Sequence, residues 1–320
     1  MEDELFWLLY EIVQQEAKHR SRLKRVQYCD AQILLVAFWA VLHDRPMCWA
    51  CCPRNWSARF GSLWLALPSP STLSVRLRRL SLQLLLEQVF YRLLAAAMTL
   101  VDGFCLCRRL DSKPLPVGIY SKDRDARCGH VGDGMLCRGY KLFGCWGKSP
   151  TAPEAVVLGP MNCSDQAGAM QLIGHLEHLY GPGPGSFGGY LLADSTHDTN
   201  PLHEMAAAHG LQLLAPRKKP QSGLGHREHA PARLRCIQLL EGEADPLSFA
   251  SNPASRGEFG PSLYRQRTQV ERDLGNATSF GGGLQPLPAW VRRPHRVVLW
   301  TVGKLIINAL RICRNQGLTP

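Results

Sequence analysis

The sequence predicts an α/β protein with a mixed β-sheet flanked by helices and with a helical N-terminal domain. Two observations lead to this fold class. Residues 1 to about 100 have helical apolar spacing, whereas the chain from Phe104 onward alternates short apolar runs with amphipathic segments. The order of three strands, helix, strand, helix, strand and a late helix suits a layered α/β arrangement. The expected domains are therefore a helical one at 1–100 and an α/β one at 101–320.

Three segments of the N-terminal region are expected to be helical. Residues 4–18 place apolar side chains at helical spacing, and Asp30 can cap the apolar run AQILLVAFWAVLH. The segment LPSPSTLSVRLRRL begins after prolines and offers Ser69 or Ser71 as its N-cap. Its leucines recur at i, i+4 and i+7, which defines one apolar face.

The other side of this third helix is basic, and it holds Arg76, Arg78 and Arg79 on or beside the face opposite the leucines. Arginine contacts both phosphate and guanine, so the helix is a candidate for a DNA groove, with Arg76 and Arg79 as the expected contacts. The alternative, a solvated helix face, is equally compatible with the pattern.

Five apolar runs of the second domain are expected to be strands, and two amphipathic segments between them to be helices. The strand candidates are FCLCRRLD, GYKLFGCWG, PEAVVLGP, GGYLLAD and LQLLAP. The first helix candidate, SDQAGAMQLIGHLEHLY, has Ser164 as its cap, and the second begins at Asn200 with Pro201 in its first turn.

The strand and helix pattern fails between the fifth strand and the late helix. Residues at about 216–260 are polar, basic and rich in turn formers, which predicts a loop-like insertion with a short helix around residues 233–241. A glycine- and proline-rich turn, GGGLQPLP, and a long helix, RVVLWTVGKLIINALRI, then complete the sequence.

The charge of the chain points to a polyanionic partner. Lys and Arg number 37 against 26 Asp and Glu, a formal net charge of +11, and the basic residues gather in HRSRLKR, RLRRL, PRKKP and WVRRPHR. Nucleic acid is the first candidate and an anionic membrane surface the second. A merely solvated basic surface remains compatible with charge alone.

The sequence also predicts a compartment. The start MEDELFWLLYEI is acidic where a secretory leader is basic, and the apolar runs ILLVAFWAVL and LIINAL are shorter than a bilayer requires. Twelve cysteines without a secretory leader are expected to be reduced thiols. We therefore expect a soluble cytoplasmic protein, associated with the nucleoid when bound to DNA and without a membrane partner.

Three carboxylates are candidates for a metal site. Asp111 and Asp194 each end a predicted strand, and Glu271 lies on the late helix. An isolated aspartate at a strand end is usually a turn residue, but the three together match the ligands of a two-metal phosphoryl-transfer site. Carboxylate oxygens suit Mg²⁺ or Mn²⁺. If the first and fourth strands are neighbours, both aspartates project from the same edge of the sheet.

Two further side chains accompany the glutamate. Tyr264, Arg267 and Glu271 fall at i, i+3 and i+7, so on a continuous helix they share one face. The guanidinium and the phenol are expected to hold a phosphate while Glu271 binds metal. Asp198, four positions beyond Asp194, is expected to support the site or cap a turn instead of binding metal.

The candidate site residues lie within characteristic sequence segments. They are DSKPLPV around the first Asp, GYKLFGCW on the next strand, LLADSTHD, YRQRTQVERDLGNATSFGGGL, and the flanking LPSPSTLSVRLRRL and PAWVRRPHRVVLWTVGKLIINALR. In this order along the chain, the segments resemble those of the bacterial insertion-sequence DDE transposases that are marked by a Tyr-Arg-Glu-Lys signature. The resemblance covers most of the chain and implies a ribonuclease-H-like catalytic core.

The resemblance implies cut-and-paste transposition of DNA. It implies recognition of terminal inverted repeats on double-stranded DNA, cleavage at the element ends and joining of the 3′ ends to target DNA by a homodimer. Asp111, Asp194 and Glu271 would be both catalytic residues and ligands of two Mg²⁺ ions about 3.5–4 Å apart, for which Mn²⁺ can substitute. Tyr264, Arg267 and Lys141 would contact DNA or phosphate.

One position departs from the signature. The family's lysine would fall seven residues after Glu271, where this chain has Thr278. Lys304 or a nearby arginine would replace it, or the contact with the transferred strand is weaker, or this copy is degenerate. Two alternatives therefore stay open: a catalytically decayed transposase that only binds DNA, and a ribonuclease-H-like nuclease that cuts without joining.

Overall fold

The structure is a computed structural model, and it describes most of the chain. The described residues are 2–18, 26–99, 105–118, 120–131, 134–147, 153–181, 187–222, 224, 226, 228–244, 251–279, 286–315 and 317.

The chain divides into two compact units. One contains residues 1–100, 116–126 and 276–320, and the other contains 101–115 and 127–275. The seam at residue 100 coincides with the expected domain boundary. Two segments that we expected in the α/β domain, 116–126 and 276–320, instead cluster with the N-terminal helices. The first unit is thus built from both ends of the chain.

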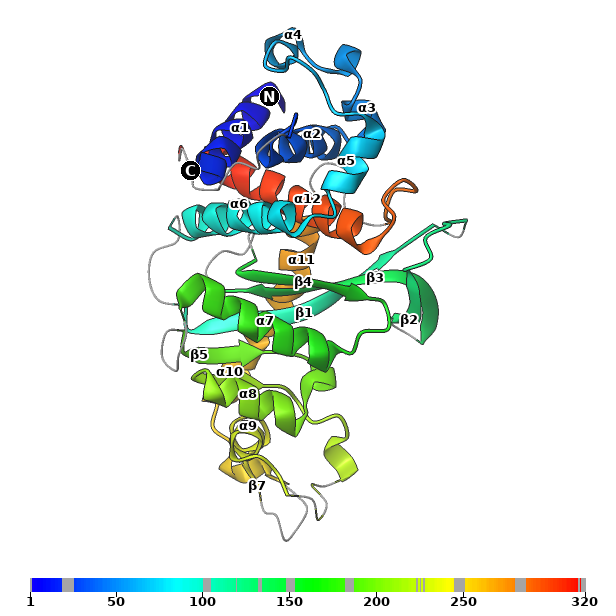
Figure 1. The fold of residues 1–320 in the computed structure, drawn as a ribbon. Helices are drawn as coiled ribbons and strands as arrows, with labels where there is room; N and C mark the ends of the chain where they lie inside the picture. The colour runs from blue at the N-terminus through cyan, green and yellow to red at the C-terminus, as the bar shows by residue number, and fades with distance from the viewer. Residues whose placement is uncertain are drawn as a thin grey trace. The chain divides into compact units, whose positions relative to one another are not determined.

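The first unit is helical. Its elements are α1 (Glu2–Lys18), α2 (Asp30–Leu42), α3 (Met47–Ala50), η1 (Pro53–Asn55), α4 (Ala58–Gly61), α5 (Pro70–Arg76), α6 (Leu80–Thr99) and α12 (Pro294–Asn315). Helices α1, α2, α6 and α12 pack on one another, as Figure 1 shows. Helix α2 is apolar on all sides from Ile33 onward and is buried from Ile33 to Leu42, as expected of a central helix.

Aromatic rings fill the space beside α2. Trp39 stacks on Trp56 with 4.8 Å between ring centroids, and Phe6 meets Trp39 edge to face at 4.9 Å. Such pairs stabilise a core beyond the burial of their area. Asp30 does not cap α2: the N-cap is Cys29, and the Asp30 carboxylate accepts a hydrogen bond from Arg76 at 2.6 Å. By contrast, Ser69 caps α5 as predicted.

Helix α6 is the only described helix long and apolar enough to cross a membrane. Its window Leu80–Met98 has a mean hydropathy of 1.2 and is 44% buried. The buried side includes Leu85, Val89 and Leu93, and the helix packs against α12, α1 and α2. The central helix of a helical bundle has the same composition, so α6 is weak grounds for a membrane span.

The second unit contains a mixed sheet, as the sequence predicted, with six strands where five were expected. Its strands are β1 (Cys107–Pro116), β2 (Arg127–Val131), β3 (Met135–Trp146), β4 (Ala155–Pro160), β5 (Gly189–Leu192) and β6 (Leu211–Leu214). They are ordered β2-β3-β1-β5-β6, with β4 also paired to β3. Strands β1, β5 and β6 are parallel, whereas β2 and β4 are antiparallel to β3.

Strand β2 was missed in the sequence because it is short and polar. It pairs with Met135–Gly139 of β3, and β4 pairs with Tyr140–Cys145 of the same strand. Where β2 approaches the end of β4, a Cβ on Gly129 would stand 2.4 Å from the carbonyl oxygen of Met161. Only glycine fits there, which is why an otherwise polar segment carries it.

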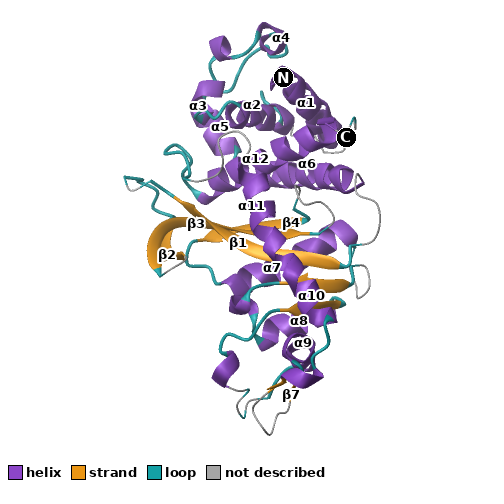
Figure 2. Cartoon of the chain, turned by 180° about the vertical axis from the view of Figure 1, so that it is seen from behind, coloured by secondary structure: helices purple, strands orange, loops and turns teal. Residues whose placement is uncertain are grey.

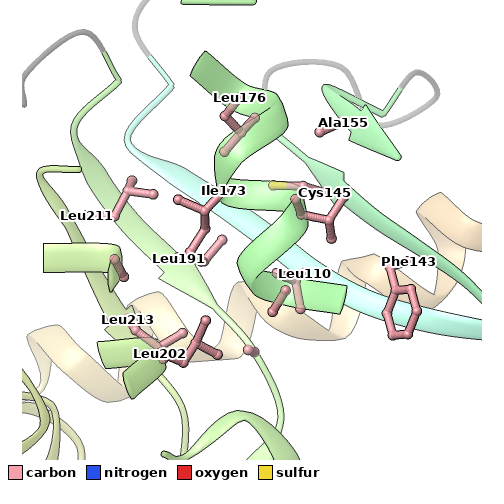
Figure 3. Close-up of a cluster of buried hydrophobic side chains, with 14 of the residues drawn as sticks. Leu110, Phe143, Cys145, Ala155, Ile173, Leu176, Leu191, Leu202, Leu211 and Leu213 are labelled. Atoms are coloured by element: carbon pink, nitrogen blue, oxygen red, sulfur yellow. The ribbon is translucent and has the colours of Figure 1, made fainter. Parts of the chain in front are cut away.

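Helices cover both faces of the sheet, as Figures 1 and 2 show from opposite sides. They are α7 (Asp165–Tyr180), α8 (Asn200–Ala208), α9 (Pro231–Glu241), α10 (Phe259–Arg265) and α11 (Gln269–Ser279). Leu110 and Leu191 pack with Ile173 of α7 and Leu202 of α8 on one face (Figure 3). Leu192 and Leu214 pack with Cys236 of α9 and Leu263 of α10 on the other.

Residues 216–260 hold more structure than predicted. The short helix is present as α9, but the segment also contains the 3-10 turns Pro220–Ser222 and Pro253–Ser255 and a hairpin of β7 (Glu243–Ala244) and β8 (Ser251–Asn252). The prediction of a loop-like insertion was therefore wrong in extent. Residues 216–260 lack apolar periodicity because only one side of α9 is buried, through Cys236 and Ile237.

Candidate active site

Asp111 and Asp194 belong to neighbouring parallel strand segments. The β1–β5 register pairs Arg109 with Leu192; Asp111 lies two residues further along β1, and Asp194 lies two residues beyond the end of β5. The first and fourth predicted strands are neighbours in the sheet, which is the condition under which both aspartates were expected at one edge. The carboxyl side of a parallel pair is where α/β sheets gather functional groups.

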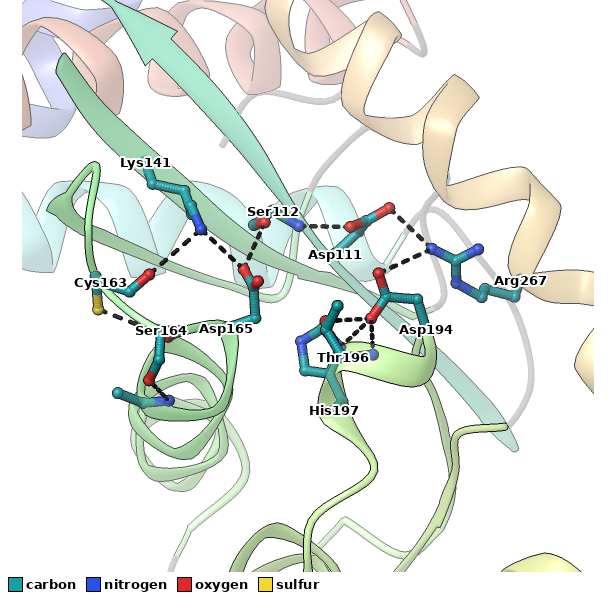
Figure 4. Close-up of polar contacts among 11 residues, drawn as sticks. Asp111, Ser112, Lys141, Cys163, Ser164, Asp165, Asp194, Thr196, His197 and Arg267 are labelled. Atoms are coloured by element: carbon teal, nitrogen blue, oxygen red, sulfur yellow. Dashed lines mark hydrogen bonds and ion pairs between the residues drawn. The ribbon is translucent and has the colours of Figure 1, made fainter. Parts of the chain in front are cut away.

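One guanidinium bridges the two carboxylates. Nη2 of Arg267 lies 3.3 Å from Oδ2 of Asp111 and 4.0 Å from Oδ2 of Asp194 (Figure 4). The other oxygen of each carboxylate is held by the protein: Oδ1 of Asp111 accepts from the backbone N–H of Ser112 at 2.7 Å, and Oδ1 of Asp194 accepts from Thr196 and His197. Both Oδ2 atoms therefore face one cationic group.

Local structure fixes Asp194 firmly. It is the N-cap of η2 (Ser195–His197), where its carboxylate accepts from the Thr196 N–H at 3.0 Å and from the Thr196 hydroxyl. Nδ1 of His197, a side chain only 1% exposed, lies 2.7 Å from the same oxygen. Burial alone would raise the pKa of Asp194, but these hydrogen bonds outweigh it and hold the pKa well below its usual value.

Asp111 has the opposite shift. Burial raises the pKa of Asp111 above its usual value, although the Ser112 N–H and the Arg267 charge act against that rise. The neighbouring Asp194 adds to the rise because two like charges stand close together. The pair thus consists of one carboxylate whose pKa is lowered, Asp194, and one whose pKa is raised, Asp111.

Tyr264 and Arg267 both reach this site. The hydroxyl of Tyr264 donates to the carbonyl oxygen of Ala193 at 3.2 Å, beside Asp194, and burial raises its pKa. Arg267 belongs to a 3-10 turn, η5 (Gln266–Thr268), that separates α10 from α11. The continuous helix implied by the i, i+3, i+7 spacing is therefore interrupted at the arginine itself.

Glu271 is not brought against the aspartates. It is exposed in the first turn of α11, and the described residues contain no group of three His, Cys, Asp or Glu side chains close enough to hold a metal. The carboxylate that α11 turns toward the sheet is Asp273, which is fully buried and lies 2.9 Å from Nε of Arg109. Sequence reasoning missed this ion pair.

A comparison with known protein families shows which family this chain belongs to. The family described as Transposase DDE domain matches residues 108–299, more than half of the chain. The chain belongs to the DDE transposase family. No curated protein and no solved structure matches it. The prediction of a DDE transposase with a ribonuclease-H-like mixed sheet is confirmed by this match and by the fold.

Behind Asp111, the transposase has a second polar network. Asp165, the first residue of α7, accepts from the Ser112 hydroxyl at 2.9 Å and from Nζ of Lys141 at 3.2 Å (Figure 4). Lys141 also donates to the carbonyl oxygen of Cys163 and is only 9% exposed. Its phosphate contact stays a prediction, and here its charge is neutralised within the protein.

Three residues of this site were missed although the sequence carries signals for them. Ser112 follows Asp111 directly, Asp165 follows the predicted cap Ser164, and His197 stands three residues after Asp194. Ser164 does cap α7, by accepting from the Ala167 N–H at 3.2 Å. A polar residue beside a predicted ligand or cap is the usual source of supporting hydrogen bonds.

Asp198 is tied to the protein as a supporting carboxylate. Its two oxygens accept from Nε and Nη2 of Arg233 at 2.6 and 2.7 Å, and Nε2 of His203 lies 3.4 Å away. Burial would raise its pKa, but the hydrogen bonds from Arg233 and His203 lower it to about 2. This bidentate pair fixes the turn that follows Asp194 onto α9.

The remaining predicted contacts lie in the helical unit. Arg76 is 6% exposed and ion-paired with Asp30, so its expected place on the open face was wrong; Arg79 is exposed. Lys304, one suggested substitute for the signature lysine, is buried and ion-paired with Asp44. Thr278 belongs to α11, and its side chain lies outside the described residues.

Proposed function

We propose that this transposase cleaves DNA at the ends of its element and joins the freed 3′ ends to target DNA. The observation that carries the proposal is the shared orientation of Asp111 and Asp194. Each gives one oxygen to the protein and turns Oδ2 toward the same cation, Arg267. Carboxylates that turn oxygens toward a common positive centre suit a two-metal phosphoryl-transfer site, where carboxylate oxygens bind the metals.

The donor set fits a hard divalent cation. Carboxylate oxygens bind Mg²⁺ and Mn²⁺, and hydrogen bonds to the second oxygen of a ligand orient it and tune its basicity. His197, Thr196 and the Ser112 N–H occupy that supporting position here. When bound, two such ions supply Lewis-acid activation of a water or 3′-hydroxyl and stabilisation of the leaving oxygen. Glu271 is the proposed third ligand. A conformational change of the 3-10 turn η5 would bring its carboxylate to the two aspartates.

The protein's own side chains would position the DNA. Arg267 is the group best placed to exchange its aspartate contacts for a phosphate, because a guanidinium matches phosphate in a bidentate manner. Tyr264, anchored beside Asp194, borders the same space. The proposed partner is double-stranded DNA, which supplies both the inverted repeats and the target. A second copy of the chain completes the complex, and the proposed compartment is the cytoplasm.

The alternative function is DNA binding without catalysis. Thr278 favours it, since a hydroxyl carries no charge to hold the transferred strand. A nuclease that cuts without joining is the third candidate. The DNA that flanks the gene supplies the substrate for testing them: inverted repeats bracketing the gene would define the ends.

The test is cleavage and joining of such end-containing DNA in Mg²⁺ or Mn²⁺. Wild type is expected to do both, while Asp111→Asn, Asp194→Asn and Glu271→Gln bind DNA but do not cleave. Glu258→Gln, at an exposed carboxylate of the same unit, is the matched control and should keep activity. Binding without cleavage by wild type establishes the decayed form, and cleavage without joining the nuclease. If Glu271→Gln alone stays active, Glu271 is not a ligand.

A further inference from the structure

Two basic stretches that are far apart in the sequence meet in the helical unit. Nη2 of Arg296, in the first turn of α12, donates to the hydroxyl of Ser74 on α5 at 2.7 Å. Arg78 lies two residues after the end of α5 and is exposed, and Arg292 lies two residues before the start of α12. The stretches RLRRL and WVRRPHR, each predicted to be a separate basic cluster, thus contribute to one surface.

The positive charge of this surface is uncompensated. Among the described residues, no carboxylate lies within 4.0 Å of the guanidinium of Arg78, Arg292 or Arg296, and Nε of Arg296 is buried without a hydrogen bond. Burial lowers the pKa of Arg296, and the charges of Arg78 and Arg292 lower it further. A desolvated cation among like charges is costly unless an anion joins it.

The pKa of His295 is affected by the same cluster of positive charges. Burial and the charges of Arg296, Arg78 and Arg293 lower its pKa to about 4, although Asp125 acts in the opposite direction. At neutral pH the ring is therefore uncharged, and its Nε2 is buried without a hydrogen-bond partner among the described residues. The position adds no positive charge at pH 7, and it keeps a polar ring atom beside the arginines.

The neighbouring Arg293 is different because it is neutralised. Its Nη1 lies 3.1 Å from Oδ2 of Asp125, and its backbone N–H donates to Oδ2 of Asp123 at 3.0 Å. Asp123 and Asp125 belong to segment 116–126, which clusters with the helical unit. The same stretch of sequence therefore contains one arginine paired with a carboxylate, whereas Arg292 and Arg296 donate to neutral oxygens, the Ala289 carbonyl and the Ser74 hydroxyl.

We propose that Arg78, Arg292 and Arg296 form a backbone-phosphate site for DNA, separate from the carboxylates of the active site. The proposal rests on the proposed function, which makes DNA the partner. Three guanidiniums without counter-charge are suited to phosphodiester oxygens, which arginine binds in a bidentate manner. Such a site holds DNA in place without reading its sequence.

The experiment compares the salt dependence of DNA binding in Mg²⁺-free buffer. Arg78→Gln is the first variant, because Arg78 is exposed and its removal leaves no buried gap; Arg296→Gln and the double variant follow. Each is expected to weaken binding to end-containing and unrelated duplexes alike. The log–log salt slope should decrease by about 0.9 for each phosphate that the variant no longer neutralises. Arg78→Lys should keep most of the affinity.

Arg314→Gln is the matched control. Arg314 lies in the last turn of the same helix and is ion-paired with Glu4 at 2.6 Å, so its loss should leave the salt slope unchanged. If Arg78→Gln and the double variant bind with the slope and affinity of Arg314→Gln, the site does not contact DNA and the proposal fails.

Two further arms separate the possible outcomes. Inorganic phosphate should raise the melting temperature of wild type more than that of the double variant. If phosphate does so but the DNA slope is unchanged, the site binds free anions and the DNA proposal is overturned. Because binding is measured without cleavage, a catalytically decayed chain would still show the weaker binding, and failure of the proposed chemistry stays distinguishable.

Discussion

Arg267 and Asp111 form an ion pair, 3.3 Å between Nη2 and Oδ2, at the place where the proposed metal ligands converge. The guanidinium supplies the positive charge that two adjacent carboxylates require, and a divalent cation must compete with it. The same residue is proposed to hold phosphate. Its two roles predict opposite effects on metal binding and on catalysis.

Arg267→Ala is therefore expected to bind Mn²⁺ more tightly than wild type in the absence of DNA. Loss of the competing charge should lower the Kd by roughly tenfold, or about 1.4 kcal/mol. Without metal the variant should melt at a lower temperature, because the carboxylates then repel each other. Cleavage and joining should both decrease. Mn²⁺ titration followed by electron paramagnetic resonance gives the Kd, with Arg265→Ala, an exposed neighbour, as control. Unchanged or weaker Mn²⁺ binding contradicts the counter-ion role.

His197→Ala is expected to impair metal binding although His197 would touch no metal. Its Nδ1 holds Oδ1 of Asp194 at 2.7 Å, and loss of such a supporting bond typically costs about 10–100-fold in metal affinity or activity. His197→Asn, which can donate to the same oxygen, should recover part of the loss. Equal Mn²⁺ affinity in all three proteins would show that Thr196 suffices to hold the carboxylate.

The Asp198–Arg233 pair predicts a pH dependence of stability. The pKa of Asp198 is lowered to about 2 in the folded protein, against about 3.9 in an unfolded chain. Its stabilising contribution, about 2–3 kcal/mol by that difference, is complete above about pH 4 and is lost as the pH falls toward 2. Urea unfolding of wild type and Asp198→Asn should differ at pH 6 and converge near pH 2. A constant difference between the two proteins would contradict the assignment.

Thr278→Lys introduces the charge that the Tyr-Arg-Glu-Lys signature, as the sequence resemblance implies it, would place at this position. Position 278 lies two helical turns beyond Glu271 within α11, so a lysine there would point to the same side as the glutamate. We expect the variant to join strands at least as well as wild type. The measurement is joining yield at one salt concentration, with Thr278→Gln as the uncharged control of similar length. Loss of joining in the lysine variant alone would mean that this register is wrong.

The sheet and the pair of aspartates were predictable because periodicity and strand ends record them directly. Asp111 and Asp194 end apolar runs, and neighbouring parallel strands bring such ends together. Glu271 was placed by its spacing from Arg267, but spacing does not record the 3-10 turn that interrupts the α-helix there. Only the fold shows that Asp273 is the carboxylate turned toward β1.

The number of basic residues in the sequence likewise does not show which of them are exposed. Arg108 is 2% exposed and pairs with the buried Glu154 at 2.8 Å, and Arg76 pairs with Asp30. A count of charges treats these two side chains like Arg78, although Arg78 is exposed and they are buried. Partners 46 residues away in sequence decide which charge is internal, and no local pattern records such pairings.

Asp111 and Ser112 are consecutive residues that serve opposite faces of β1: the first meets Arg267, and the second meets Asp165. Since side chains alternate along a strand, a one-residue insertion or deletion upstream in β1 would exchange them, with a hydroxyl facing the guanidinium and a carboxylate facing Asp165. Substitutions at apolar positions of β1 can be absorbed by repacking, but a change in length cannot. The start of β1 is therefore a segment in which length, more than composition, decides whether a variant of this protein keeps Asp111 and Ser112 on their own faces of the strand.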